Sequence, residues 1–446
     1  MAQVSVGAAG PWYSALNRSQ WKALAASNLG WMFDGYETYA LILTVGVALH
    51  QLLNAALYPQ IPAYAGIVIF FTLLGWGIGG ILAGVLADYI GRRRTMVLSI
   101  LAYSAMTGLS AFAWDWQSFA ALRFLVGIAI GTEWVTGTSM TAELWPDHAR
   151  GKGAGLMQCG LGIGFFLASL IWLYVGAMGP GAWRYMYFIG VVPALMTLWI
   201  RRNIPESPMW EEASRRRRAA VARKRDGASL DVADRALARF TLHDMIADRA
   251  IRPRLIAALV MSFATTLGWW GISSWVPPFV GSMAAKAGLP AQQWASYAGM
   301  VYNIGAICGY VGLGFVADAL GRKPVVLTYF ALSFVMTPVL FLWTSDLTLM
   351  LVATALLGLF SLGLYSWMPV WLPELFPTRM RGTAVAFCFN APRFVACFGP
   401  LIAGSLIAQF GGFGHAATTV AFIYILGLAA TPFLPETRGR PLPETV

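Results

Sequence analysis

Long apolar stretches recur along almost the whole chain, and they constrain its fold more than any other feature. Each is about 20 residues long, the length that an α-helix needs to cross the hydrocarbon core of a bilayer. Only 11% of the residues are charged, against roughly 25% in soluble globular proteins, so a soluble fold is excluded. We therefore expect an all-α membrane protein with twelve transmembrane helices, at about 21–49, 63–87, 95–114, 118–144, 152–178, 183–201, 254–280, 294–317, 324–343, 346–371, 383–409 and 415–434.

The chain carries a net charge of +11, from 31 basic and 20 acidic residues, and the basic residues are unevenly placed. If both termini are cytoplasmic, all of them except Arg123, Arg184, Lys286 and Arg393 lie in the termini or in loops on that same side. This positive-inside distribution predicts a multi-pass protein of the cytoplasmic (inner) membrane with both termini in the cytoplasm. It also attributes the basic run at 215–225 to topology and contact with membrane lipids, and not to nucleic-acid binding.

Three short motifs each occur twice, and the second copy follows the first at nearly the same spacing. They are Gly84–Arg93 and Gly314–Lys323, the E-x6-R-G motifs from Glu143 and Glu374, and the Pro-Glu-Ser/Thr segments 205–207 and 435–437. Because separate motifs keep one register, we expect two six-helix bundles related by a parallel repeat. The predicted domains are an N-terminal bundle at 1–202, a basic cytoplasmic linker at 203–253 and a C-terminal bundle at 254–446. Within the linker, 206–222 is considered as a surface helix.

The paired loop motifs resemble the signature of the major facilitator superfamily, and the resemblance covers the whole chain. The E-x6-R-G and Pro-Glu-Ser/Thr motifs are similar to those of its sugar-porter and metabolite–proton symporter branches. The resemblance implies a secondary transporter with a substrate cavity between the halves near mid-membrane, open alternately to each side. It also implies that charged residues close the cytoplasmic side through ion pairs. These candidate gating residues are Asp88, Arg92, Glu143, Arg150, Asp318, Arg322, Glu374 and Arg381.

Electrostatics alone leads to a similar expectation for the loop motifs. Asp88 and Asp318 lie at helix ends, where a carboxylate can face the positive N-terminus of a neighbouring helix. Arg92, Glu143 and Arg150 belong to the same cytoplasmic motifs and can form ion pairs at these helix ends. The alternative is that these charges only anchor the helix ends in the interface.

Five charged residues fall inside the predicted helices, and each is a candidate functional residue because charge at bilayer depth is costly. Asp34 and Glu37 share one face of the first helix because they are three residues apart. We expect Arg123 at the depth of Asp34 and predict a pair between them, with the carboxylate binding a proton when the arginine turns away. The alternative is a static ion pair that holds two helices together. The candidate proton-coupling residues are Asp34, Glu37, Arg123 and Glu133.

Other energy sources and chemistries lack their motifs. The four histidines lie in loops or at helix ends, so protons must travel through carboxylates. No lysine stands in a Gly-Lys-Ser/Thr context, so ATP hydrolysis through a phosphate loop is excluded. The four cysteines show no CxxC spacing, and no nucleophile–base pair stands out. We expect neither an enzyme nor a metal or organic cofactor, with the proton as the coupling ion.

Two helix motifs narrow the expected substrate class. Phe33–Glu37 (FDGYE) resembles the D-G-Y/F-D signature of aromatic acid–proton symporters, with Glu37 in place of the second aspartate. The stretch Arg123–Trp134 is similar to the sialate and monocarboxylate–proton symporter branch. Both branches move organic anions. Gly127 and Gly131 lie four residues apart on the face of Arg123 and permit another helix to approach closely.

Arg393 is the only charge expected inside the helices of the C-terminal half. A planar carboxylate fits the guanidinium fork, so substrate contact is one interpretation, and pairing with backbone carbonyls is the other. Polar-tipped aromatic side chains are further candidates because they stack on rings and donate hydrogen bonds. The candidate substrate-binding residues are Arg393, Asn390, Tyr36, Trp270, Tyr302, Asn303, Tyr365 and Trp367, with Trp269 and Trp275 beside them.

The leading functional hypothesis is proton-coupled uptake of a small organic carboxylate: an aromatic acid, a monocarboxylate or a sugar acid. A neutral sugar or polyol porter is the alternative that the loop motifs favour. Efflux is disfavoured because Gly160-Leu-Gly162-Ile-Gly164 stands where drug antiporters carry a proline–glycine motif. A non-transporting receptor is a fourth possibility. The expected partners are a small organic anion, protons and membrane lipids, with the chain acting as a monomer.

Overall fold

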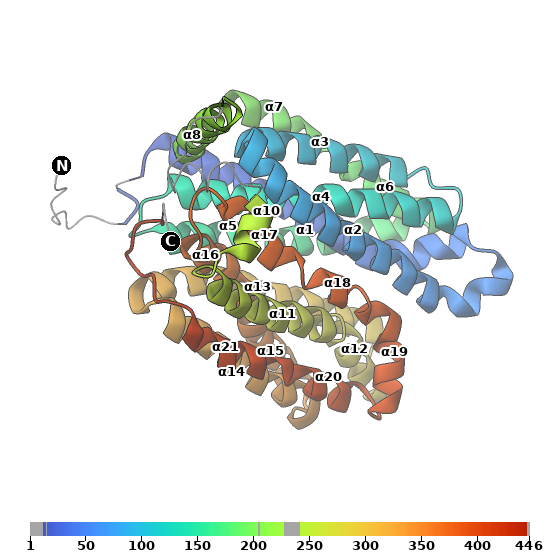
Figure 1. Cartoon of the computed structure of the whole chain (residues 1–446). Helices are drawn as coiled ribbons and strands as arrows, with labels where there is room; N and C mark the ends of the chain where they lie inside the picture. Colours follow the sequence, from blue (N-terminus) through green and yellow to red (C-terminus); the bar gives the residue numbers. More distant parts are fainter. Residues whose placement is uncertain (1–11, 15, 204–205, 227–240, 444–446) are drawn as a thin grey trace.

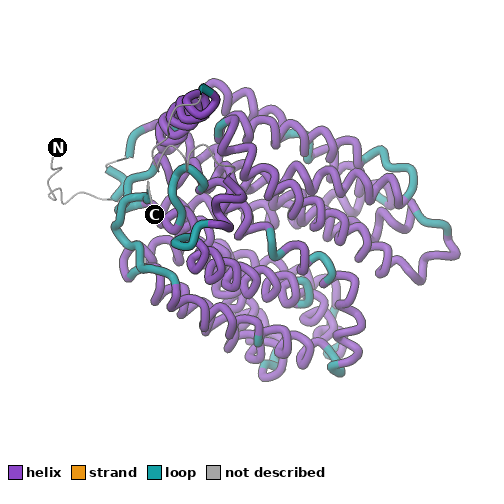
Figure 2. Tube along the Cα trace, in the orientation of Figure 1, coloured by secondary structure: helices purple, strands orange, loops and turns teal. Residues whose placement is uncertain are grey.

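The computed structural model describes residues 12–14, 16–203, 206–226 and 241–443, and within these the secondary structure is entirely helical (Figure 2). The first half contains seven α-helices and three short 3-10 turns. The helices are α1 (Arg18–Leu52), α2 (Ile61–Ile90), α3 (Arg92–Ser110), α4 (Trp116–Leu144), α5 (Arg150–Val175), α6 (Trp183–Ile189) and α7 (Pro193–Asn203). The turns are η1 (Ala55–Gln60), η2 (Gly176–Met178) and η3 (Pro180–Ala182).

The second half is divided more finely. Its helices are α11 (Arg252–Ser273), α12 (Val276–Lys286), α13 (Ala291–Leu320), α14 (Arg322–Pro338), α15 (Leu347–Leu357), α16 (Trp367–Leu375), α17 (Arg381–Asn390), α18 (Arg393–Ala396), α19 (Gly399–Gln409), α20 (Phe413–Ala421) and α21 (Ile423–Ala430). Short π or 3-10 segments adjoin α14, α15, α16 and α21. They are η4 (Val339–Trp343), η5 (Gly358–Leu362), η6 (Gly363–Ser366) and η7 (Thr431–Phe433).

Between the halves lie α8 (Pro208–Arg225) and α10 (Thr241–Ala247). The structure therefore contains a helix close to the surface helix considered at 206–222. The linker residues 204–205 and 227–240, like 1–11 of the first predicted domain, lie outside the described residues. We call the end of the molecule that carries α8 and α10 the basic end, and the opposite one the far end (Figure 1).

Nine helices of the described chain are long and apolar enough to cross a membrane. They fall in nine of the twelve expected stretches; the stretches at 21–49, 95–114 and 183–201 are not among them. Each of these three has a local reason. The helix α1 contains two buried acids, α3 begins with three arginines, and the sixth stretch is divided between α6 and α7.

Several stretches expected as single helices are broken. The sixth divides at Gly190–Val192, just before Pro193, which lacks a backbone N–H and fits only the first turn of a new helix. The stretch at 254–280 divides before Pro277, and the stretch at 383–409 divides around Pro392 and Pro400. Proline interrupts the hydrogen-bond ladder at these places. Arg252–Lys286 and Arg381–Ala403 nevertheless each form one candidate span, whereas the sixth stretch is divided between α6 and α7.

The helices pack in two bundles whose contact surface runs through the middle of the molecule (Figure 1). In the first bundle α2 packs on α4 and α1 on α5, and Gly127 and Gly131 of α4 face the backbone of α2 directly. A Cβ on Gly127 would lie 2.2 Å from the Thr72 carbonyl oxygen, so the predicted close approach at these glycines is confirmed. The two bundles meet where α5 packs on α13 and α2 on α17.

Candidate functional site

A buried charge cluster lies at the basic end, where α2, α3, α4 and α17 meet. Arg92 Nη2 lies 3.0 Å from Glu143 Oε1, and Arg92 Nη1 lies 3.1 Å from Asp88 Oδ1. Arg381, from the second bundle, places Nη1 3.2 Å from the same Glu143 oxygen. Glu143 therefore joins the two bundles through a carboxylate that both arginines share.

The sequence repeat produces a matching cluster in the second bundle. Arg322 Nη2 lies 2.7 Å from Glu374 Oε1 and its Nη1 3.0 Å from Asp318 Oδ1. Arg150, from the first bundle, lies 3.2 Å from Glu374 and also pairs with Asp147. The arginine of each E-x6-R-G motif thus forms an ion pair with the glutamate of the motif in the other half.

The two loop aspartates bind helix N-termini across the same interface. Asp88 Oδ2 accepts hydrogen bonds from the Thr383 backbone N–H (2.9 Å) and hydroxyl (2.7 Å), at the start of α17. Asp318 accepts from the backbone N–H groups of Gly151 (3.2 Å) and Lys152 (3.0 Å), at the start of α5. Carboxylates at these positions interact favourably with the helix dipoles. The bundles are therefore held together at the basic end.

The Pro-Glu-Ser/Thr segments brace the turns that precede α3 and α14. Glu206 accepts from the backbone N–H groups of Arg92 and Arg93, and Glu436 accepts from those of Arg322 and Lys323. Burial raises the pKa of Glu436, but these and other backbone N–H donors outweigh it and hold the pKa below its usual value. Gly321, at φ +105°, leaves the space that Glu436 occupies, because a Cβ there would lie 2.8 Å from Oε2.

Inside the first bundle, Arg123 pairs with Glu37. Arg123 Nη1 lies 3.1 Å from Glu37 Oε2, both side chains are buried, and the guanidinium lies 5.1 Å from the centre of the Tyr187 ring. The predicted pair between Arg123 and Asp34 is not formed, so this prediction was wrong. Residues three apart on a helix point about 60° apart around its axis, and α4 presents Arg123 to the Glu37 side.

Asp34 instead lies beside Glu133 of α4. The carboxylate oxygens of both residues are buried and have no hydrogen-bond partner among the described residues. Gly30, one turn before Asp34, makes room for Glu133, because a Cβ there would lie 2.0 Å from Oε1. Two buried acids without partners are rare, since an unpaired buried charge costs several kcal/mol.

A cavity of about 340 Å³ lies between the bundles. It lies toward the far end, away from the charge clusters. Both halves line it: Tyr39 and Phe165 from the first, and Trp269, Trp270 and Tyr302 among others from the second. Tyr39 stacks on Phe165 with ring centres 4.8 Å apart, and Phe165 is nearly parallel to Trp269 at 6.3 Å. The cavity therefore has a wall of parallel aromatic rings.

Two residues that line this cavity have indole N–H groups without an acceptor. The indole N–H groups of Trp269 and Trp270 are buried, and neither has an acceptor in the described part of the chain. The two rings lie 4.4 Å apart at 70°, so the donors come from adjacent side chains. A ligand with acceptor oxygens would satisfy both groups, which otherwise carry the cost of an unmade hydrogen bond.

The candidate substrate residues divide into two sets. Trp270, Tyr302 and Asn303 line the cavity, as do Trp269 and Trp275. The others lie outside its lining and have partners within the protein: Tyr36 donates to the Met186 carbonyl (2.9 Å), Tyr365 to Thr266 (3.1 Å), Trp367 to Thr265 (2.9 Å) and Asn390 to the Ala386 carbonyl (2.9 Å).

Two aromatic residues, Tyr365 and Phe389, link Arg393 to the cavity-lining Trp269. Trp269 contacts Tyr365, Tyr365 contacts Phe389, and the Arg393 guanidinium lies 4.1 Å from the Phe389 ring centre and 4.5 Å from that of Trp76. The side chain is buried and donates to the Phe389 carbonyl, and its Nε has no partner among the described residues. The backbone-carbonyl interpretation is thus the one realised in this structure.

Tyr39 and Phe165, the first-bundle part of the aromatic wall, were not among the candidate residues from the sequence. Tyr39 follows Tyr36 by three residues, so it was available as a second aromatic residue near one face of the first helix. Phe165 had no such signal, because it is one of many aromatic residues in an apolar helix.

Two helical bundles, joined by ion pairs at one end and enclosing a ligand-sized cavity, define a multi-pass membrane transport protein. Residues 23–445 match the family model described as sugar (and other) transporter, and the chain belongs to this family of the major facilitator superfamily. It is a transporter of small metabolites and not an enzyme.

Several named proteins align with nearly the whole length of this chain. A Haemophilus influenzae protein named for metabolite transport is 31% identical, over 96% of this chain and 99% of its own. The sialic acid transporter of Escherichia coli is 26% identical, over 93% and 94% respectively. The gentisate transporter of Corynebacterium glutamicum is 27% identical, over 87% and 82%. The proton:xylose symporter XylE has the same fold, with a TM-score of 0.74, 21% identity and coverage of 95% and 98%.

Proposed function

We propose that this protein is a proton-coupled symporter that imports a small organic carboxylate across the cytoplasmic membrane by alternating access. The observation that carries the proposal is the combination of unpaired acids and unused donors. Asp34 and Glu133 lack hydrogen-bond partners in the described chain beside the Glu37–Arg123 pair, and the indole N–H groups of two cavity-lining residues, Trp269 and Trp270, lack acceptors. The first set binds a proton and the second binds an anion.

The proton site comprises Asp34 and Glu133, with Glu37 and Arg123 as the neighbouring pair. Two adjacent carboxylates in a dry site cannot both stay ionised at acceptable cost, so a shared proton stabilises them. When the proton leaves, Arg123 can turn from Glu37 to Asp34, so the positive charge of the arginine replaces that of the proton. Asp34 was expected from the sequence to carry the proton. The proposal assigns it that role, with Glu133 as its partner.

The substrate site is the aromatic cavity. The Trp269 and Trp270 indoles donate to the carboxylate, and the Tyr39–Phe165–Trp269 wall packs on the body of the substrate. Arg393 adds a buried positive charge outside the lining of the cavity. Sialic acid and gentisate, named for two relatives, are both carboxylates, one a sugar acid and one an aromatic acid.

The gate comprises the two ion-pair clusters at the basic end. In this structure Glu143 and Glu374 each bind an arginine of the other bundle, so that end is closed. Release of substrate requires these interactions and the Asp88 and Asp318 helix contacts to break together. The doubled motif explains why both halves contribute equally to the closure.

The same proposal assigns twelve membrane spans to the chain, as two bundles at 1–202 and 254–446 joined by the linker 203–253. The nine spans found by length and apolarity are then completed by α1, α3 and the α6–α7 pair. The basic end with its clustered arginines faces the cytoplasm, and so do both termini. The transporter acts as a monomer, because the cavity and the proton site lie within one chain.

The first test is a thermal-shift measurement on purified protein with gentisate, sialic acid and xylose at two pH values. A bound ligand stabilises by about 2.7 kcal/mol at 100 times its Kd, so a binder is detected without transport. We expect an acid to stabilise the protein more at low pH, because the proton and the anion bind together. Stabilisation by xylose and by neither acid would replace the proposal with a sugar porter.

A further inference from the structure

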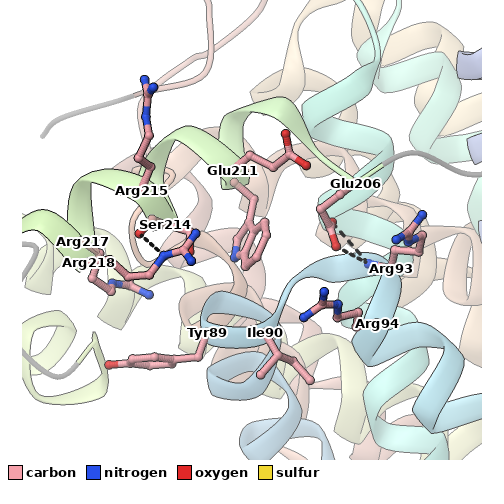
Figure 3. Close-up of a pocket in the computed structure, with 11 residues that line it drawn as sticks. Tyr89, Ile90, Arg93, Arg94, Glu206, Glu211, Ser214, Arg215, Arg217 and Arg218 are labelled. Atoms are coloured by element: carbon pink, nitrogen blue, oxygen red, sulfur yellow. Dashed lines mark hydrogen bonds between the residues drawn. The ribbon is translucent and has the colours of Figure 1, made fainter.

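A second cavity, of about 520 Å³, lies on the surface at the basic end, between α8 and the turn from α2 to α3 (Figure 3). It is separate from the substrate cavity and shares no residue with it. Its lining contains five arginines and two glutamates. They are Arg93, Arg94, Arg215, Arg217 and Arg218, with Glu206 and Glu211. Aromatic side chains of Tyr89 and Trp210 complete the walls.

Two of these arginines are available for a ligand. Arg94 on α3 and Arg218 on α8 are exposed and extend toward the same space from opposite walls (Figure 3). Neither forms an ion pair with any described residue, and Arg218 makes only a 3.4 Å contact from Nε to the Ser214 carbonyl. Arg215 points away from the cavity and pairs with Glu212.

Glu206 and Arg217 are already engaged in contacts within the protein, whereas Glu211 is exposed. Glu206 accepts hydrogen bonds from backbone N–H groups at the start of α3, so its charge is offset there. Arg217 donates to the carbonyls of Asp88 (2.9 Å) and Arg379 (2.8 Å), and Trp210 donates to the Asp88 carbonyl (3.0 Å). The cavity therefore offers two exposed arginines, Arg94 and Arg218, against one exposed acid, Glu211.

Two stripes of exposed apolar side chains lead from this cavity into the membrane region. Leu82, Leu86 and Tyr89 follow one face of α2, and Leu98 and Leu101 follow Arg94 on α3 at helical spacing. Leu82 is 62% exposed and Leu98 54%. Since the candidate span that contains α2 ends at Ile90, we place the cavity near headgroup level, with this apolar surface on its membrane side.

We propose that this cavity binds the phosphate of an anionic phospholipid, with Arg94 and Arg218 as its ligands and the α2 and α3 leucines in contact with its acyl chains. The arginine fork matches phosphate oxygens, and Tyr89 and Trp210 are side chains typical of the membrane interface. Bound lipid ties α8 to the α2–α3 turn. It therefore supports the contacts of Trp210 and Arg217 with Asp88, a residue of the closed basic end.

The test uses the full purified chain, delipidated in detergent at about 0.15 M salt, where weak surface attraction is screened. Short-chain phosphatidylglycerol, short-chain phosphatidylcholine and glycerol phosphate are titrated separately, and bound lipid is counted by native mass spectrometry. We expect phosphatidylglycerol alone to bind one-to-one. Removing both arginines in Arg94→Gln/Arg218→Gln should weaken its binding by about tenfold or more, since each arginine near a membrane surface contributes about fivefold.

The matched control is Arg223→Gln/Arg225→Gln, which removes two exposed charges from the same helix outside the cavity. It should keep the affinity of the wild type. Equal loss in both double variants would overturn the proposal in favour of general charge attraction. Glycerol phosphate binding as tightly as the lipid would overturn the lipid assignment. If the double variant does not fold, Arg218→Gln alone serves, and unchanged binding there also overturns it. None of these outcomes depends on the transported substrate or its coupling ion.

Discussion

Arg123 Nη1 lies 3.1 Å from Glu37 Oε2, and both side chains are buried, so the positive charge of α4 is neutralised one turn beyond Asp34. This leaves Asp34 and Glu133 as neighbouring acids with no hydrogen-bond partner among the described residues. A static ion pair and a proton site therefore lie side by side on α1 and α4. The first two predictions below separate their roles.

Replacing Asp34 by asparagine should abolish accumulation of substrate against a gradient while exchange between pre-loaded vesicles continues. The amide keeps the shape of the side chain but cannot take up and release a proton. The measurement is uptake of radiolabelled gentisate or sialic acid, whichever binds, into proteoliposomes under an imposed proton gradient. Glu211→Gln, which removes an exposed acid of α8, is the control and should behave as wild type. If Asp34→Asn still concentrates substrate, Asp34 is not the coupling acid.

Gly30→Ala should uncouple transport although it changes no charged residue. The new Cβ would lie 2.0 Å from Glu133 Oε1, so the Glu133 carboxylate must leave its present position against α1. Gly46→Ala on the same helix is the matched control, because a Cβ there meets nothing within 4 Å. Protons and substrate entering together are counted with a pH-sensitive dye and radiolabel. A proton-to-substrate ratio that is unchanged in Gly30→Ala would show that the Asp34–Glu133 contact does not matter for coupling.

Trp270→Phe should weaken binding of the acid while preserving the aromatic wall. Losing a hydrogen bond to a charged group costs about 1.5–3 kcal/mol, so affinity should fall about tenfold or more. The uncharged amide of the same acid should lose less. Trp343→Phe, at a side chain that is 70% exposed on the molecular surface, is the control. Equal losses for acid and amide would assign Trp270 to packing and not to carboxylate recognition.

Arg393→Gln should lower affinity for the acid more than for its amide, because the guanidinium is a buried positive charge linked to the cavity wall through Phe389 and Tyr365. Since the arginine does not line the cavity in this state, the effect should be smaller than that of Trp270→Phe. Lysine should restore part of the loss, as it keeps the charge without the planar fork. Normal binding of the acid in Arg393→Gln would leave the arginine with a structural role only.

Glu143→Gln should open the basic end. Removing one partner of a buried ion pair costs about 3–5 kcal/mol, and Glu143 binds arginines of both bundles. That energy changes a two-state population by about 100-fold or more. Spin labels on cysteines at Tyr89 and Leu320, in a background without the native cysteines, should report a longer distance. Glu212→Gln, whose partners are on its own helix, should leave the distance unchanged. The gating assignment fails if both variants give the wild-type distance.

Much of this architecture could be predicted from the sequence. The apolar stretches, the doubled loop motifs and the few charges inside helices are local or periodic signals, and they identified a family member with two similar halves. The doubled loop motifs and the resemblance that they carry also selected the acids and arginines that form the two clusters at the basic end.

What only the tertiary structure decided is which of these side chains meet. The sequence favoured Asp34 as the partner of Arg123 from its expected depth, but the rotation of α1 against α4 places the arginine beside Glu37 and Glu133 against α1 near Asp34. Likewise, Arg393 lies outside the lining of the cavity, whereas Trp269 and Trp270 line it. Helix rotation and breaks are set by the packing of small residues and by prolines against distant neighbours, and that information does not lie in any one segment of the chain.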